Sequence, residues 1–165
     1  MILSRKRSMG FRRAGRFGPV LATVLFLLMT ACNSNLGPAP PAAQFPSGAT
    51  FRLEIADDPE SRRRGYMFRE QVGPDEGMLF VFDGPDRHPI WMKNCKVSLD
   101  LIWLDEAGQV VEIARERQPC SAVGPCPSAF PMRLAHYVLE VAGGTAMREG
   151  LRRGDVVTLH LAQRE

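Results

Sequence analysis

Hydrophobic residues alternate with polar ones, or follow one another in short runs, over most of the chain after residue 50, and both patterns predict β-strands. Phe51, Leu53 and Ile55 alternate with charged residues, which is typical of a strand with one buried face. Similar short segments predict further strands at residues 78–82, 90–92, 97–104, 110–114, 134–141 and 156–161. Residues 83–86, Asp-Gly-Pro-Asp, have the composition of a turn.

Helices are predicted to be few and short. Asp58 followed by Pro59 is a typical helix start, and we expect this helix to end near Gly65. One helical turn is expected at residues 145–149. Because no long helix separates the strands, a doubly wound parallel sheet is not expected. The pattern predicts a mainly β fold, a small antiparallel sandwich or barrel-like domain with one or two short helices.

The first 31 residues differ from the rest, since they contain six basic residues and no acidic one. An apolar run at residues 20–29 follows the basic region, which is typical of a secretory signal peptide. The run is too short to span a bilayer comfortably as a helix. Leu28-Met29-Thr30-Ala31-Cys32 resembles the bacterial lipoprotein box, in which the cysteine becomes the lipidated first residue of the mature protein. An ordinary cleaved signal with an unrelated cysteine is the alternative.

The segment that follows Cys32 has the composition of a flexible linker. Residues 33–49 are uncharged and rich in proline and alanine, so they cannot bury enough surface to form a core. We therefore expect a signal peptide at 1–31, a lipidated cysteine with its tether at 32–49, and a β-rich domain at 50–165. Asn33 is not the aspartate that favours inner-membrane retention, so we expect an exported protein, lipid-anchored in the outer membrane and facing the periplasm.

The charge of the folded part argues against a nucleic-acid partner. The whole chain has a formal charge of +3, but only 15 of its 21 basic residues follow residue 31, against all 18 acidic ones. From Cys32 onward the net charge is therefore −3. A protein that binds nucleic acid is expected to carry positive charge on its folded domain.

Three cysteines lie within the predicted domain. Cys120 and Cys126 occur in a proline-rich loop, and after export we expect them to form a structural disulfide. A redox-active pair is less favoured because the spacing is not Cys-x-x-Cys. Cys95 remains as a single thiol, either a buried small hydrophobic residue or a reactive group.

The densest group of unusual residues follows the strand predicted at 90–92. Trp91, Lys93 and Asn94 place an apolar ring beside a cation and an amide, a combination that suits a small polar or anionic ligand. Arg64, at the end of the first helix, is expected to point toward such a pocket. The structural alternative is that Trp91 belongs to the core, Lys93 is solvated and Asn94 forms a turn.

Two chemical alternatives stay open. A hydrolase-like enzyme would use Asp100 as a base, with Lys93 and Asn94 stabilising developing negative charge. Metal or redox handling would use soft sulfur ligands, although methionines also fill gaps in cores. The sulfur residues concerned are Met67, Met78, Met92 and Cys95. No phosphate loop, nucleophile elbow or zinc-protease motif is present, and no cofactor or resident metal is expected.

A series of motifs resembles the bacterial and archaeal family called domain of unknown function 192. The motifs are RGYMFR at 64–69, GMLFVF at 77–82, WMKN at 91–94, LDLI at 99–102 and YVLE at 137–140, and the similarity extends over residues 50–161. The resemblance implies a compact, mainly β domain, often exported, with no settled activity, substrate or cofactor. Members often carry threonine in place of Cys95. The motif positions that become candidate site residues are Arg64, Met67, Arg69, Trp91, Lys93, Asn94 and Asp100.

These observations favour a non-catalytic function. We expect a lipid-anchored protein of the cell envelope whose domain binds a small polar or anionic ligand or serves an envelope protein. Its partners would be the membrane, through the lipid anchor, and that ligand or protein.

Overall fold

The computed structural model describes residues 39–120 and 123–161. The predicted signal peptide, Cys32 and the tether as far as residue 38 lie outside the described residues and stay predictions. Within the described ranges, no helix has both the length and the apolar character that a membrane crossing requires.

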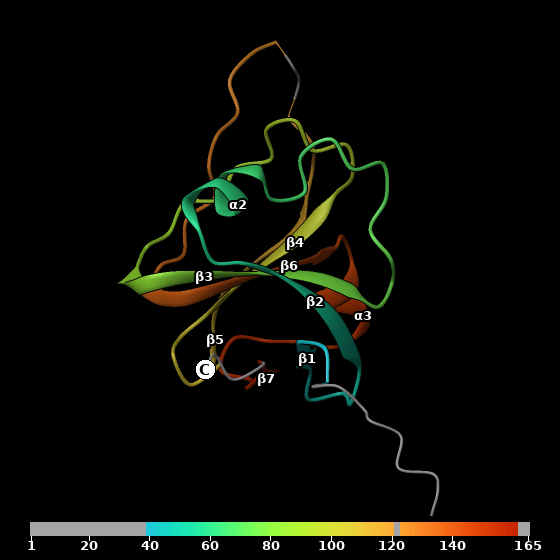
Figure 1. Cartoon of the computed structure of the whole chain (residues 1–165), viewed down its shortest axis with the longest axis vertical. Helices are drawn as coiled ribbons and strands as arrows, with labels where there is room; N and C mark the ends of the chain where they lie inside the picture. The colour runs from blue at the N-terminus through green and yellow to red at the C-terminus, as the bar shows by residue number, and fades with distance from the viewer. Residues whose placement is uncertain (1–38, 121–122, 162–165) are drawn as a thin grey trace, which may run out of the picture. The chain divides into compact units, whose positions relative to one another are not determined.

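The described residues form one curled sheet of seven strands and two short helices (Figure 1). The sheet order is β5-β4-β6-β3-β2-β1-β7. The prediction of a mainly β, barrel-like domain is confirmed. The strands are β1 (Ala42–Gln44), β2 (Thr50–Ala56), β3 (Glu76–Asp86), β4 (Leu99–Leu104), β5 (Val110–Arg117), β6 (Ala135–Ala142) and β7 (Thr158–His160), and the helices are α2 (Pro59–Arg64) and α3 (Thr145–Arg148).

One pair of strands departs from the predicted antiparallel arrangement. β2 and β3 are parallel, with Leu53 opposite Gly77 and Ile55 opposite Leu79, whereas the other neighbouring strands are antiparallel. Parallel pairing needs a crossover of a dozen or more residues, and the segment that contains α2 provides it. The helix covers only part of this crossover. The prediction took a long helix as the sign of parallel strands, so it missed this pair.

The folded domain begins before residue 50, within the segment predicted as tether. Strand β1 pairs with β2 and β7, and Ala43 and Phe45 are almost fully buried. The Phe45 ring lies 4.6 Å from that of Phe51, between centroids. A three-residue strand is too short to give a periodic signal, so composition alone assigned it to the linker.

Two other local predictions are wrong. Residues 83–86 do not form a separate turn, because β3 continues to Asp86 across an irregularity in its pairing with β6. Residues 90–92 do not form a strand, and Ile90 makes only an isolated bridge with Ala129. Ile90 and Met92 are buried all the same, so the apolar character of residues 90–92 reflects packing without a continuous ladder.

The loop after β5 is closed as predicted. Cys120 and Cys126 form a disulfide with a Cα–Cα distance of 5.4 Å, and Cys95 is the free cysteine among the described residues.

The sheet is covered on both faces. All six residues of β4 are buried because alternate side chains enter two different hydrophobic clusters. Ile102 and Leu104 belong to the α3-side cluster, defined as the buried group that includes Ala146 of α3. Leu101 and Trp103 belong to the α2-side cluster, the buried group that includes Tyr66 just after α2 and Phe80.

Helix α2 starts and ends where the sequence predicts. The Asp58 carboxylate accepts hydrogen bonds from the backbone N–H groups of Glu60 and Ser61, at 2.8 and 3.0 Å. The helix ends at Gly65, whose φ is +46°. A Cβ at this position would lie 3.1 Å from the Phe80 ring, so glycine allows the end of α2 to lie directly on the sheet.

Asp100 is a structural anchor on the α3 side of the sheet. Its carboxylate is fully buried and accepts hydrogen bonds from the backbone N–H groups of Glu116, Gly144 and Ala146, at 2.7, 3.1 and 2.6 Å. These bonds join β4 to the end of β5 and to the start of α3. A carboxylate is suited to this place because it only accepts hydrogen bonds.

Replacing Asp100 by asparagine is therefore expected to destabilise the protein. In Asp100→Asn an NH₂ group takes the place of one oxygen and opposes backbone donors, so we expect the free energy of unfolding to fall by about 3 kcal/mol. Chemical denaturation measures the loss, and Asp83→Asn, at an exposed acid, is the matched control. Equal stability of the two variants would contradict the anchoring role.

Candidate ligand-binding site

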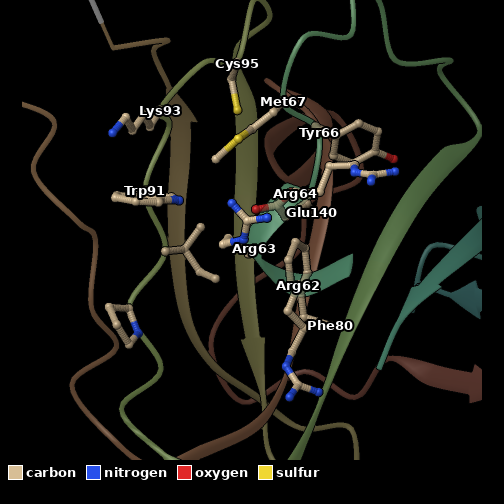
Figure 2. Close-up of a pocket in the computed structure, with 13 residues that line it drawn as sticks. Arg62, Arg63, Arg64, Tyr66, Met67, Phe80, Trp91, Lys93, Cys95 and Glu140 are labelled. Carbon is tan, nitrogen blue, oxygen red and sulfur yellow. The ribbon is translucent and has the colours of Figure 1, made fainter. Parts of the chain in front are cut away.

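A small cavity of about 60 Å³ opens on the α2 side of the sheet (Figure 2). The residues around α2 form one wall, the segment from Pro89 to Cys95 forms the other, and strands β3 and β6 form the base. We call this cavity the α2 pocket. Its lining residues are Arg62, Arg63, Arg64, Gly65, Tyr66, Met67, Phe80, Pro89, Ile90, Trp91, Lys93, Cys95 and Glu140.

Glu140 forms the acidic part of the base. Its pairing partners on the neighbouring strands are the buried Met78 of β3 and Leu101 of β4, and its own exposure is only 3%. No described residue forms a hydrogen bond or ion pair with its carboxyl group. Burial raises the pKa of Glu140 to about 8, so the group is mostly protonated at neutral pH.

Two further titratable groups share this environment. Burial and the charge of Glu140 raise the pKa of the Cys95 thiol to about 11. Burial, together with the same carboxylate, also raises the pKa of Tyr66. Both groups therefore stay protonated at neutral pH, which makes Cys95 a poor nucleophile.

The arginine that faces the pocket is Arg63. Figure 2 shows its side chain extending into the space between Trp91 and Glu140. None of the ion pairs among the described residues includes Arg63. Arg64, predicted to fill this role, lines the rim, but its guanidinium pairs with Glu60 at 3.0 Å. The four-residue spacing on one helix face explains that pairing.

Arg62 is engaged elsewhere. Its guanidinium donates to the backbone carbonyls of Asp57 and Val81, at 2.7 and 2.8 Å, and lies over the Phe82 ring. It therefore ties α2 to β3, so that among the described residues Arg63 is the guanidinium of this wall without an ion pair or a hydrogen bond.

Trp91 and Lys93 form the opposite rim. Trp91 is 43% exposed, so it is not a core residue, and the Lys93 ammonium lies 5.2 Å from the centroid of its ring. Asn94 connects this rim to the residues that follow α2. Its backbone carbonyl accepts a hydrogen bond from the Phe68 N–H at 2.8 Å, and its side-chain NH₂ group lies 3.7 Å from the sulfur of Met67.

The remaining predicted site residues are not brought together here. Arg69 pairs with Glu54 and lies over the outer face of Tyr66, in a neighbouring groove. Asp100 lies on the α3 side of the sheet, opposite the pocket that Lys93 lines, so the predicted hydrolase arrangement is not formed.

Of the predicted sulfur ligands, only Met67 and Cys95 line the pocket. Cys95 is also buried with Met78 and Met92 in the α2-side cluster, where these side chains contribute to the core. Among the described residues, no group of three histidine, cysteine or acidic side chains is placed to hold a metal ion.

Glu140 and Arg63 were missed from the sequence. A signal for Glu140 was present, because it shares the strand face of the buried Val138 and stands where a hydrophobic residue is expected. Nothing in three consecutive arginines distinguishes Arg63, since the surroundings of the helix decide which one faces the pocket.

The raised pKa of Glu140 predicts a pH-dependent stability. Above about pH 4.5 the unfolded chain ionises this group while the folded protein retains the proton, so the free energy of unfolding falls until about pH 8. Glu140→Gln removes this titration. We expect its melting temperature relative to the native chain to rise by about 3 °C or more between pH 5 and pH 8, and then to level off.

Differential scanning calorimetry across this pH range measures the effect. Glu106→Gln, at an exposed acid, is the matched control and is expected to follow the native chain. A constant difference between Glu140→Gln and the native protein would contradict the raised pKa.

Comparison with known proteins places the domain in a family. No curated protein matches the chain. A protein of unknown function from Novosphingobium aromaticivorans DSM 12444 is 32% identical, with 73% of this chain and 84% of that chain covered and a TM-score of 0.65. A putative transcription regulator from Sinorhizobium meliloti 1021 is 31% identical, with 74% and 98% covered and a TM-score of 0.63. The model of the DUF192 family, described as an uncharacterized ACR, matches residues 42–159, and the chain belongs to this family.

Proposed function

We propose that this chain is a lipid-anchored protein of the cell envelope whose domain binds a small polar or anionic ligand in the α2 pocket. The observation that carries the proposal is the buried carboxyl group of Glu140, which faces a cavity and has no partner among the described residues. A buried polar group without a hydrogen bond is unfavourable, and a ligand that supplied the bond would gain affinity from it.

The walls of the pocket complement such a ligand. Arg63 offers guanidinium donors from one side, and Trp91 offers a half-exposed ring on the other. A cavity of about 60 Å³ accepts a group of a few atoms rather than a whole cofactor. We therefore infer that the polar end of the ligand enters the cavity while its body lies against Trp91.

Binding is better supported than catalysis. Glu140 is the one carboxyl group among the described residues that line the pocket, and Cys95 is held as a thiol. Hydrolysis needs an activated nucleophile or water beside a base, and Asp100 lies on the other side of the sheet.

Export and anchoring are supported by independent features. The basic and apolar segments before Cys32 have the form of a lipoprotein signal, and a disulfide such as Cys120–Cys126 persists in an oxidising compartment. We propose the periplasmic side of the outer membrane, because Asn33 is not the aspartate that favours inner-membrane retention.

A role in transcription is not carried over from the relative described as a putative transcription regulator. The net charge of −3 from Cys32 onward does not favour contact with a nucleic-acid backbone.

Acylation at Cys32 is tested by expressing the native chain and Cys32→Ala in a bacterial host. We expect the native protein in the membrane fraction, with mass spectrometry showing diacylglycerol on an N-terminal Cys32, and the variant without acyl chains. Cys95→Ala is the control and is expected to remain membrane-bound. An unprocessed native chain in the cytosol would refute the anchor.

Ligand binding is tested with a pool of small molecules extracted from the bacterial cell envelope. We expect the pool to raise the melting temperature of the native protein, and Arg63→Ala and Lys93→Ala to lose most of this rise. Arg152→Ala removes an exposed arginine that does not line the pocket and is expected to respond like the native chain. Equal shifts in all four proteins would show that the binding site lies elsewhere.

A further inference from the structure

We infer that the ligand of the α2 pocket is an organic oxyanion, a carboxylate or a phosphate, and that it binds to the protonated form of Glu140. This inference deepens the proposed binding function and rests on it. It specifies the charge and the chemical class of the group that enters the cavity.

The charges around the opening favour an anion. Arg63 has no ion pair among the described residues, and the Lys93 ammonium lies over the Trp91 ring. Arg64 and Arg62 add positive charge to the same rim, although their guanidinium groups also bind Glu60 and backbone carbonyls. A cationic ligand would approach against this positive potential, whereas an anion would be attracted by it.

The base of the pocket accepts an anion only in its neutral form. The Glu140 carboxyl lies between Met78 and Leu101, where an ionised group is poorly solvated. As a neutral acid it offers an O–H donor, and a bond from O–H to an anionic oxygen is short and strong. The planar guanidinium of Arg63 has the geometry to donate to the same oxyanion.

The size of the cavity agrees with this head group. A volume of about 60 Å³ corresponds to the space of a few water molecules, which a carboxylate or phosphate fills. The carbon body of the ligand must then lie outside the cavity. Trp91, at the rim and 43% exposed, presents an apolar surface for it.

Glu140 is the group whose titration would control binding. The other charged or titratable side chains that line the pocket are Arg62, Arg63, Arg64, Tyr66, Lys93 and Cys95. The register partners of Glu140 on β3 and β4 are Met78 and Leu101, which do not titrate. The pKa values of Cys95 and Tyr66 are raised, so both remain protonated up to pH 9. With a Glu140 pKa of about 8, the protonated fraction falls about tenfold between pH 6 and pH 9, and the affinity for an oxyanion is expected to fall with it.

The test uses three ring compounds that differ only in their head group: benzoate, benzamide and benzylamine. Calorimetric titration of the purified full chain at pH 6 is expected to show the highest affinity for benzoate and no binding of benzylamine. Phenyl phosphate, titrated in parallel, shows whether carboxylate or phosphate is preferred. Arg63→Ala is expected to weaken benzoate binding at least tenfold, and Arg152→Ala to leave it unchanged.

The role of Glu140 is tested by repeating the benzoate titration at pH 9. We expect the native chain to bind about tenfold more weakly than at pH 6, and Glu140→Gln to show a ratio near one. Preferential binding of benzylamine, equal binding of all three compounds, or a tenfold ratio retained in Glu140→Gln would overturn the inference and leave the pocket as a binding site. If neither these compounds nor phenyl phosphate binds, and the envelope pool gives no shift, the proposed function fails as well.

Discussion

The burial of both faces of the sheet is the constraint on which the rest of the structure depends. Central strands such as β4 and β6 are covered on both faces, so a buried polar side chain on them is unfavourable unless it finds a partner. Two acids occupy these strands at neighbouring register positions, since Asp100 is paired with Val141 and Glu140 with Leu101. Their side chains point to opposite faces of the sheet, and their hydrogen bonding differs.

Asp100 accepts hydrogen bonds from three backbone N–H groups and joins β4, β5 and α3, so its hydrogen-bonding capacity is used inside the protein. Glu140 meets hydrophobic neighbours and a small cavity, so its charge is suppressed and its hydrogen-bonding capacity is unused. This contrast separates a structural acid from a candidate functional one. The proposed ligand site lies on the α2 side, where Arg63 and Trp91 line the same cavity as Glu140.

The strands could largely be predicted from alternating side chains and from short apolar runs, because residues of a strand point alternately to two faces and burial of one or both faces gives these patterns. The parallel pairing of β2 and β3 could not, because strand direction depends on how the crossover folds back over the sheet. The three-residue strand β1 was missed for a related reason. It is too short to show a periodic pattern, and it is a strand because it pairs with β2 and β7. Of the candidate site residues, Trp91 and Lys93 could be identified as an exposed ring beside a cation, whereas Arg64 and Asp100 were assigned roles that their partners prevent.

The sequence by itself determined the β-rich character, the start and end of α2, and the family, because each depends on local periodicity, on capping chemistry or on ordered motifs along the chain. It also predicts a signal and lipidation segment, because such segments are recognised as linear motifs. Only the tertiary structure decided which acid is satisfied and which is left facing a cavity, and which of three consecutive arginines points into it. Those properties depend on neighbours that are distant in sequence, and a linear pattern does not encode which residues the curled sheet brings together.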